Sequence, residues 1–176
     1  YQTEGQIYAQ YIQENIENPK IAILWQNDDF GKDYLIGMKE ALGEAAETLI
    51  VAEAPYEVAQ PTVDSEVLSL KASGANVFFI VATPKFAAQA IKKSHELGWG
   101  AERFLSNVSV SVGAVLKPAG FEASKGVISA AYLKEATDPQ WADDPAMQEW
   151  RAFMDEHYPD GDKASSFTVF GYGVAK

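Results

Sequence analysis

Three short apolar runs in this chain each end in a small polar loop, and a helical pattern follows each loop. The runs cover residues 21–25, 77–82 and 104–105, and the loops begin at Asn27, Thr83 and Ser106. A chain that alternates strands with helices in this way forms a parallel sheet with right-handed crossover connections. The carboxyl ends of parallel strands meet at one edge, where folds of this class bind ligands. We therefore expect the three loops to converge there.

Hydrophobic periodicity extends this pattern over the whole chain. It predicts strands at residues 20–25, 49–54, 76–82, 103–105 and 126–131. It predicts helices at residues 3–17, 31–45, 64–73, 85–97, 112–117, 147–154 and 167–176. Pro118 is expected to end the short helix at 112–117, and the first helix carries Ile7, Tyr8, Tyr11 and Ile12 on one face. The predicted fold class is α/β, with a doubly wound, mostly parallel sheet flanked by helices.

The composition is that of an ordinary globular domain, and it limits the possible partners. The chain has 176 residues, 47% of them hydrophobic, which is enough for one domain with its own core. Its 25 acidic and 14 basic residues give a formal charge of −11, and this field repels phosphate backbones and anionic lipids. We therefore expect no nucleic-acid partner. The absence of cysteine excludes thiolate catalysis and thiolate metal sites.

The sequence contains no apolar stretch near the roughly 20 residues that span a bilayer, and no secretory leader. If the protein is exported, its signal peptide lies outside this chain and has been removed.

The sharpest local cluster of charge is the carboxylate pair Asp28 and Asp29 after the first strand. Such a pair holds Mg²⁺ in phosphoryl-transfer receivers of similar fold, but a receiver also needs an Asp at the end of the central strand. Here that position offers Thr83 after Ala82. The alternative is that one of the two carboxylates caps the helix that starts near Gly31, and we favour this interpretation.

Other catalytic patterns are weaker still. The two histidines, His95 in a helix interior and His157 at a helix end, do not follow strands, and no nucleophile-elbow, zinc-protease, dinucleotide or phosphate-loop motif is present. We expect no catalytic residue, no metal and no cofactor. An enzyme with a flavodoxin-like fold is kept as a third hypothesis, which would need carboxylates or a nucleophile to converge at the strand ends.

Polar loop residues offer a different chemistry, that of orienting a solute. The hydroxyl and amide groups of the loop 106–109, and the hydroxyl of Thr83, both donate and accept hydrogen bonds. An ordinary turn with a capping serine explains the loop equally well. Lys85 stands near a helix start, where a solvated lysine is the simpler interpretation. Phe30 is the aromatic residue best placed to contact an apolar ligand.

Five segments, taken in order, resemble one family. They are YQTEG (residues 1–5), QNDDFGKDY (26–34), PTVDS (61–65), LKASGA (70–75) and GY (171–172). Their order and spacing resemble the type I solute-binding proteins of branched-chain amino acid ABC importers, the leucine/isoleucine/valine-binding kind. Proteins of this family have two α/β lobes, which are joined by hinge strands and close on a solute. The resemblance implies that this chain is one of the two lobes. Residues 1–176 would form the second ligand-binding lobe alone, with 164–176 returning toward a first lobe outside this chain.

The resemblance also implies a set of ligand contacts. Carried over by position, the expected site residues are Asp29, Phe30, Thr83, Pro84, Ser106, Asn107 and Val108. Relatives that bind amino acids place an acidic residue near the position of Val108 to hold the ligand's ammonium group, and this loop has none. Because an unpaired buried ammonium costs several kcal/mol, an α-amino acid is disfavoured, and an amide-like or aromatic carboxylate solute is favoured.

The sequence therefore predicts an extracytoplasmic receptor that delivers a small organic solute to the membrane permease of an ABC importer. Its location would be periplasmic, or extracellular and anchored in a bacterium with one membrane. The expected partners are the solute, the permease and the missing first lobe. The alternative is the effector-binding domain of a transcription regulator with the same architecture, which would carry a helix-turn-helix segment upstream of Tyr1.

Overall fold

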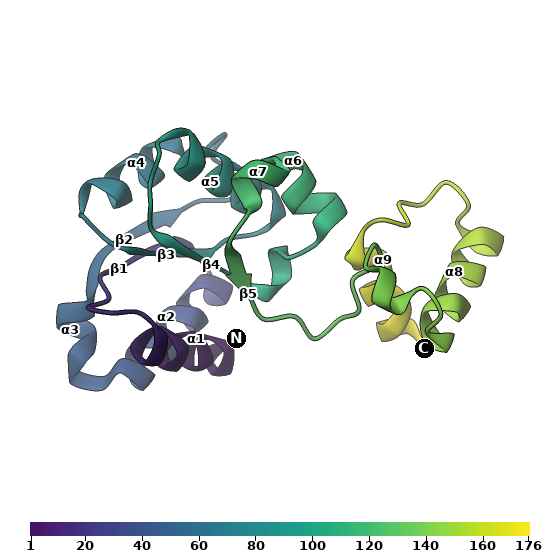
Figure 1. The fold of residues 1–176 in the computed structure, drawn as a ribbon, viewed down its shortest axis with the longest axis horizontal. Helices are drawn as coiled ribbons and strands as arrows, with labels where there is room; N and C mark the ends of the chain where they lie inside the picture. Colours follow the sequence, from purple (N-terminus) through teal and green to yellow (C-terminus); the bar gives the residue numbers. More distant parts are fainter.

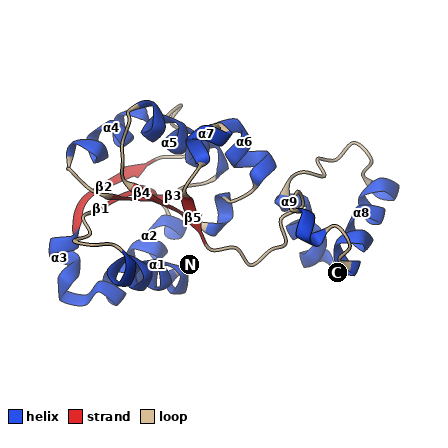
Figure 2. Cartoon of the chain, in the orientation of Figure 1, coloured by secondary structure: helices blue, strands red, loops and turns tan.

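The computed structural model describes residues 1–176 and has at its centre a five-stranded parallel sheet (Figures 1 and 2). The strands are β1 (Ile21–Gln26), β2 (Ile50–Tyr56), β3 (Val77–Val81), β4 (Glu102–Leu105) and β5 (Val127–Ser129). Their order in the sheet is β2-β1-β3-β4-β5, and all four neighbouring pairs are parallel. The predicted fold class is confirmed. The strand order reverses beside β1, as in doubly wound folds, so a crevice is expected at the carboxyl ends of the strands.

Helices cover both faces of the sheet (Figure 1). One face carries α1 (Gln2–Asn15), α2 (Asp29–Leu42) and the short α3 (Ala46–Leu49). The other carries α4 (Asp64–Ala72), α5 (Pro84–Glu96), α6 (Lys117–Ala119) and α7 (Phe121–Ser124). Single-turn segments join them: η1 (Gly43–Ala45), η2 (Asn107–Ser109), η3 (Val112–Leu116) and η4 (Pro139–Trp141), of which η3 is a π-helix.

The sheet separates two hydrophobic cores, and β3 is buried along its whole length because it contributes to both. Phe78 and Ile80 face the core under α4 and α5, whereas Val77, Phe79 and Val81 face the core under α1 and α2. This alternation explains why the strand reads as a continuous apolar run.

The buried face of α1 differs from the apolar face read in the sequence. Of the four residues expected on the apolar face, Tyr8 and Ile12 are buried, but Ile7 is 53% exposed and Tyr11 is 43% exposed. Ala9, which was not among them, is fully buried. The small residues decide the orientation of the helix. Gly5 lies so close to α2 that a Cβ atom would be 2.6 Å from the Tyr34 carbonyl oxygen, so α1 turns this side to its neighbour.

The expectation that Pro118 ends a helix was wrong. Residues 112–116 form a π-turn, and Pro118 lies in the first turn of α6, where its missing N–H removes no intrahelical hydrogen bond. The segment ends at Gly120, whose φ of 99° is a conformation that residues with a Cβ rarely adopt.

After β5 the chain leaves the sheet in an extended segment and forms a second small helical unit (Figure 1). In it α8 (Pro145–His157) and α9 (Ser166–Ala175) pack around Ala136, Met147, Trp150 and Met154. We call residues 136–176 the helical unit. No helix of the protein is both long enough and apolar enough to traverse a lipid bilayer.

Candidate functional site

The carboxyl ends of β1, β2 and β3 are joined by a buried hydrogen-bond network. Tyr56 donates its hydroxyl hydrogen to Gln26 Oε1 at 2.8 Å, and the Thr83 hydroxyl donates to the same oxygen at 2.9 Å. The Thr83 backbone N–H donates to the Tyr56 hydroxyl oxygen at 3.0 Å. Burial raises the pKa of Tyr56, so this hydroxyl keeps its proton. Thr83 is therefore held by its neighbours, and Pro84 follows it as the first residue of α5.

The carboxylate pair at the end of β1 has a structural role in its first member. Asp28 Oδ1 accepts the Gly31 backbone N–H at 3.1 Å and caps α2, as favoured from the sequence. Asp29 is exposed in the first turn of the same helix, where a negative charge is favourable. No group of three or more His, Cys, Asp or Glu side chains is placed to hold a metal ion.

Phe30 belongs to an aromatic cluster at the start of α2. Its ring meets Tyr1 edge-on at a centroid distance of 5.0 Å and Tyr34 at 5.4 Å, and Tyr1 and Tyr34 stack at 5.5 Å. Tyr1 in turn lines the cavity described below, so the Tyr1 ring lies between Phe30 and that cavity.

The loop after β4 uses its two serines to bind backbone. Ser106 and Ser109 are fully buried, and both donate to the Ala82 carbonyl oxygen, at 3.5 Å and 2.6 Å. Asn107 and Val108 lie between them and are only partly buried. The serines thus fix the loop to the end of β3, and the two residues between them are the ones presented to the ligand edge.

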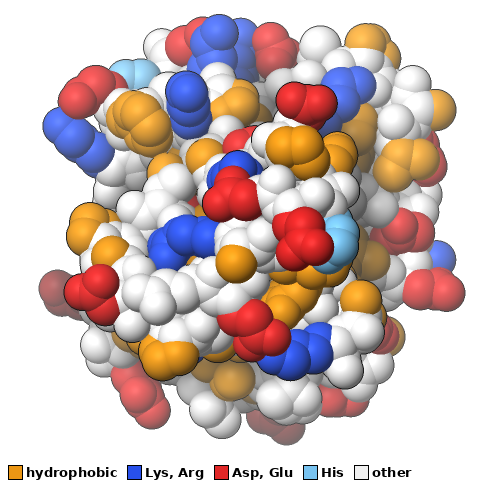
Figure 3. Space-filling view, turned by 90° about the vertical axis from the view of Figure 1, so that its right-hand side faces the viewer, with side chains coloured by type: hydrophobic (Ala, Val, Ile, Leu, Met, Phe, Trp, Pro, Cys, Tyr) orange, Lys and Arg blue, Asp and Glu red, His pale blue; other side chains and the backbone are white.

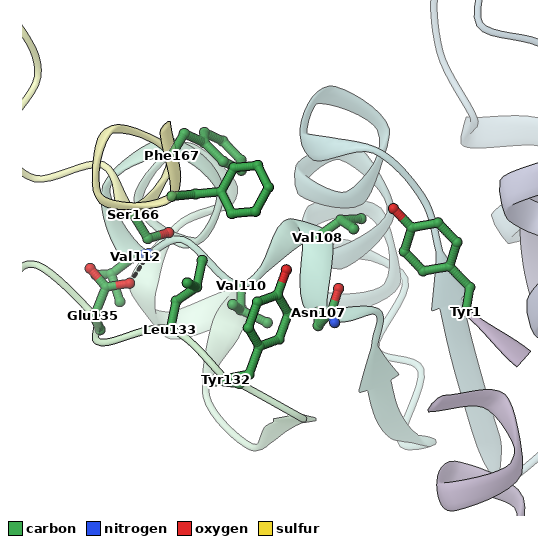
Figure 4. Close-up of a pocket in the computed structure, with 12 residues that line it drawn as sticks. Tyr1, Asn107, Val108, Val110, Val112, Tyr132, Leu133, Glu135, Ser166 and Phe167 are labelled. Atoms are coloured by element: carbon green, nitrogen blue, oxygen red, sulfur yellow. Dashed lines mark hydrogen bonds between the residues drawn. The ribbon is translucent and has the colours of Figure 1, made fainter. Parts of the chain in front are cut away.

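A cavity of about 370 Å³ lies at this edge, between the β4 loop and the helical unit (Figure 4). Twelve residues line it, and nine of them are hydrophobic: Tyr1, Val108, Val110, Val112, Ala131, Tyr132, Leu133, Phe167 and Phe170, with the polar Asn107, Glu135 and Ser166. In the close-up, Tyr1 and Tyr132 stand on either side of Asn107 and Val108 (Figure 4). The cavity suits a small, largely apolar solute.

Two of the seven predicted site residues, Asn107 and Val108, line this cavity. The other five lie at or near the same strand edge but outside its lining, and Ser106 is inaccessible. The lining residues that the sequence did not suggest come mainly from the segment after β5 and from the start of α9. No local pattern in the sequence pointed to Tyr132, Phe167 or Phe170.

Two hydrogen bonds at the cavity link the start of η3 to the chain beyond β5. The Ser166 backbone N–H donates to Ser111 Oγ at 3.3 Å, and the Val112 N–H donates to Glu135 Oε2 at 3.4 Å. The other oxygen of Glu135 accepts the Thr137 N–H and hydroxyl at 3.3 Å and 3.1 Å. The Glu135 carboxylate is thus engaged at both oxygens, although it faces the cavity.

The α1 side of the edge carries buried tyrosines and one carboxylate. Tyr8 donates to the Leu105 carbonyl oxygen at 2.8 Å and accepts the Ala130 N–H at 2.6 Å, so it joins α1 to both β4 and the end of β5. Burial raises the pKa of Tyr8 to about 12. Burial also raises the pKa of Tyr34, and the nearby Glu4 carboxylate adds to this shift. Glu4 Oε1 accepts the Asn107 backbone N–H at 2.9 Å.

The face seen in Figure 3 shows acidic and basic side chains scattered among hydrophobic and uncharged ones, with no continuous basic surface. Eight ion pairs of Lys or the N-terminal amino group with a carboxylate occur in the protein. Seven of them join residues outside the cavity lining, and the eighth joins the amino group of Tyr1 to Asp33. No Lys or Arg side chain lines the cavity.

Comparison with known proteins gives a consistent result. A family model described as periplasmic binding protein matches residues 1–176. The chain is similar to a substrate-binding periplasmic protein from Ralstonia solanacearum, with 27% identity and a TM-score of 0.82 over 98% of this chain and 47% of that chain. No curated protein matches the chain with significance.

Two further structures share the fold. One is a fatty acid ABC transporter substrate-binding protein from Thermomonospora curvata, with 24% identity and a TM-score of 0.74 over 98% of this chain and 43% of that chain. The other is a branched chain amino acid ABC transporter from Thermus thermophilus with bound valine, with 15% identity and a TM-score of 0.78 over 96% and 42% of the two chains. The chain thus spans about half the length of the structures that it matches.

Proposed function

The chain belongs to the periplasmic binding protein family, and we propose from this premise that it forms the second ligand-binding lobe of a solute receptor for an ABC importer. The broader expectation from the sequence, a periplasmic binding protein, is confirmed by the family match. The leucine/isoleucine/valine-binding kind remains a prediction.

The observation that carries the proposal is the apolar cavity at the carboxyl edge of the sheet. It has a volume of about 370 Å³ and is walled by the β4 loop on one side and by α9 on the other. Ligands bind at this edge in doubly wound sheets. A receptor of this kind closes by a hinge motion of its two lobes around the solute, so the edge that carries this cavity would face the first lobe.

The proposed solute is a small organic molecule with an apolar body: an amino-acid-like compound, an amide or an aromatic carboxylate. The apolar lining supports this class, because the aromatic side chains of Tyr1, Tyr132, Phe167 and Phe170 contribute large contact surfaces. Among the similar structures, one is a fatty acid ABC transporter substrate-binding protein and another has bound valine, and both of these solutes have apolar bodies.

We further propose that the closed receptor presents the solute to a membrane permease outside the cytoplasm, with a first lobe completing the site. The family match supports an extracytoplasmic location. The proposed role requires no catalysis, and the family and the similar structures are solute-binding receptors.

Calorimetric titration of the full-length protein with amino acids, amides and aromatic carboxylates tests the proposal. We expect saturable binding, with one solute per protein, from at least one of these three classes. Titrations without heat of binding for every class would contradict the assignment as a receptor for such solutes.

The variant Tyr132→Ala tests the position of the site. Tyr132 is 70% exposed and lines the cavity, so its removal leaves the core intact but takes away one aromatic wall. Loss of such a contact costs about 1–3 kcal/mol, so we expect the solute's Kd to rise about tenfold or more. Tyr158→Ala, at a tyrosine that is 56% exposed and outside the cavity lining, is the control. Equal affinities for the two variants would place the site elsewhere.

A further inference from the structure

Helix α9 is apolar over more of its surface than the structure covers. It spans Ser166–Ala175 and contains no charged residue. Phe167 is 41% exposed, Phe170 is 44% exposed and Val174 is 71% exposed, and Ser166 is the one buried residue of the helix. A helix that is apolar around its whole circumference is normally buried around its whole circumference. The uncovered side of α9 is therefore a surface that another structural element should cover.

The large side chains of α9 form two stripes with different surroundings. Val169 and Tyr172 pack against the core of the helical unit. Phe167, Phe170 and Val174 follow one another at spacings of three and four residues, so they share the other side of the helix. We call these three residues the α9 stripe. Phe167 and Phe170 line the cavity, whereas Val174 lies outside its lining, so the stripe starts in the cavity and leads out of it.

The core of the helical unit is small for the length of the unit. It consists of four buried hydrophobic residues, and a unit of about 40 residues rarely folds on a core of its own. Trp150 belongs to this core, and its buried indole N–H has no acceptor. Phe153, on the same helix, is 42% exposed. The helical unit therefore needs support from outside itself.

The sheet provides only part of that support. The Ser166 backbone N–H donates to Ser111 Oγ at 3.3 Å, and the backbone of Ala164 closely approaches Gly113. Residues 131–134, which lead from the sheet to the unit, make no backbone–backbone hydrogen bond. Figure 1 shows α8 and α9 standing beside the sheet at the end of this extended segment, not packed on either face of the sheet. Most of the surface of α8 and α9 is thus left uncovered.

We propose that an apolar surface of the first lobe docks on the α9 stripe, an inference that rests on the proposed function. The chain spans 47% of a similar structure, so more than half of such a protein lies outside this chain. Because the stripe begins inside the cavity, an element that covers Val174 also lies at the cavity, which is where the first lobe has to complete the site. The helical unit is then held between the two lobes.

The position of the stripe favours the first lobe over other partners. A second copy of the chain, or the permease, could also bury three apolar side chains. Either of them would cover Phe167 and Phe170 as well as Val174, and would then stand between the cavity and the first lobe. Such a partner would compete with the closure of the receptor, whereas the first lobe takes part in it.

The variant Val174→Asp tests the inference in the full-length protein, because Val174 is exposed in this structure and lies outside the cavity lining. If the first lobe covers this position, the aspartate is buried without a partner, and we expect the melting temperature to fall by at least about 5 °C. Leu68→Asp is the control, since Leu68 is an apolar residue of α4 that is 55% exposed. We expect its melting temperature to stay within about 2 °C of the wild type.

A milder variant, Val174→Ala, gives an answer even if the aspartate variant does not fold. At an exposed helical position this change is slightly stabilising, because alanine has the higher helix propensity. At a covered position it removes packed methyl groups, and we expect the melting temperature to fall by about 2–5 °C. Leu68→Ala is expected to change the melting temperature by less than about 2 °C. The sign of the change at Val174 therefore shows whether the stripe is covered.

Sedimentation of the wild type and of Val174→Asp identifies the partner. We expect a monomer for both proteins. A wild-type dimer that the substitution converts to a monomer would assign the stripe to a second copy and overturn the inference. An unchanged or raised melting temperature for Val174→Ala, with Val174→Asp tolerated as well as Leu68→Asp, would show an open stripe and overturn it too. None of these measurements uses a solute, so titrations without binding count against the receptor function and not against the docking of the first lobe.

Discussion

The polar side chains at the carboxyl edge of the sheet fall into two groups with different roles. Thr83, Ser106 and Ser109 direct their hydroxyls to the backbone or to neighbouring side chains and are used in holding the loops. Asn107 keeps an unpaired atom at the cavity. The hydrogen-bond partner therefore decides the role of a polar loop residue. Where the side chain bonds to backbone or to a neighbouring side chain it stabilises the loop, and where it has no partner it is available to a ligand.

The network at the ends of β1, β2 and β3 gives a first prediction. Tyr56→Phe removes the hydroxyl that accepts the Thr83 backbone N–H and donates to Gln26, in a side chain that is 1% exposed. An unpaired buried N–H costs about 1–3 kcal/mol, and we expect the free energy of unfolding to fall by that amount in urea titrations. Tyr158→Phe, at an exposed position, is expected to be neutral, and equal stability of the two variants would contradict the role of the network.

Tyr8 gives a prediction about pH. Burial raises its pKa to about 12, whereas a tyrosine in the unfolded chain ionises near pH 10. Between these values the unfolded chain has released a proton that the native protein still holds, so the free energy of unfolding falls as the pH rises. From about pH 9 to about pH 12 we expect the wild type to lose about 2 kcal/mol more stability than Tyr8→Phe.

The measurement for Tyr8 is urea unfolding of both proteins at several pH values in this range. At the lower end, Tyr8→Phe is expected to be the less stable protein, because it lacks the hydrogen bonds to Leu105 and Ala130. The difference should shrink as the pH rises. Two parallel stability curves would show that the buried hydroxyl does not keep its proton.

At the scale of elements, periodicity predicted the strands and the long helices because their apolar residues follow the faces that the fold covers. The run 77–81 is apolar at every residue because both faces of β3 are covered, and α5 shows a clear apolar stripe because it packs on one core. The orientation of α1 was predicted less well, because backbone contacts at Gly5 and Gly37 set its rotation and these leave no apolar pattern. The π-turn at 112–116 has no periodic signal at all.

The contact between α1 and α2 depends on a close backbone approach, which Gly37→Ala tests. A Cβ atom at residue 37 would be 2.0 Å from the Gln2 carbonyl oxygen, so α1 would have to shift away from α2. Helix propensity alone would make this substitution favourable by about 1 kcal/mol, but overpacking costs about 1–3 kcal/mol or more. We therefore expect a net loss in the free energy of unfolding.

The control for Gly37→Ala is Gly100→Ala, since a Cβ atom at residue 100 meets nothing within 4 Å and the φ angle there is not in the left-handed region. We expect a change within about 0.5 kcal/mol for this variant, as for most surface substitutions. A stabilised Gly37→Ala protein would mean that the two helices have room to separate without loss.

At the scale of the molecule, the sequence predicted the ligand edge but only part of the site. Asn107 and Val108 were found because they lie in the loop after a strand and because the family resemblance implies ligand contacts at these positions. Glu4 and Phe167 reach the same region from segments far away in sequence, through the packing of α1 and the return of α9. Contacts of this kind depend on tertiary structure, so no local sequence pattern predicts them.

The contact between the helical unit and the rest of the molecule includes a close backbone approach at Gly113. Gly113 lies in the π-turn, and a Cβ atom there would be 2.6 Å from the Ala164 carbonyl oxygen and 3.0 Å from its carbonyl carbon. This contact lies beside the Ser111 to Ser166 hydrogen bond, where the helical unit meets the sheet. Because α9 supplies one wall of the cavity and the β4 loop the other, separating them at Gly113 opens the cavity.

We therefore expect Gly113→Ala to weaken the binding of the solute at least about tenfold, which corresponds to about 1.4 kcal/mol. Gly113 itself belongs to neither core of the sheet, so the main unfolding transition should change little. Limited proteolysis is expected to cut the extended segment at residues 130–136 faster than in the wild type, because Glu135 in that segment accepts a hydrogen bond from the N–H of Val112, the residue next to Gly113. Gly100→Ala serves again as the control. Unchanged affinity together with unchanged cleavage would show that the position of the helical unit does not govern the site.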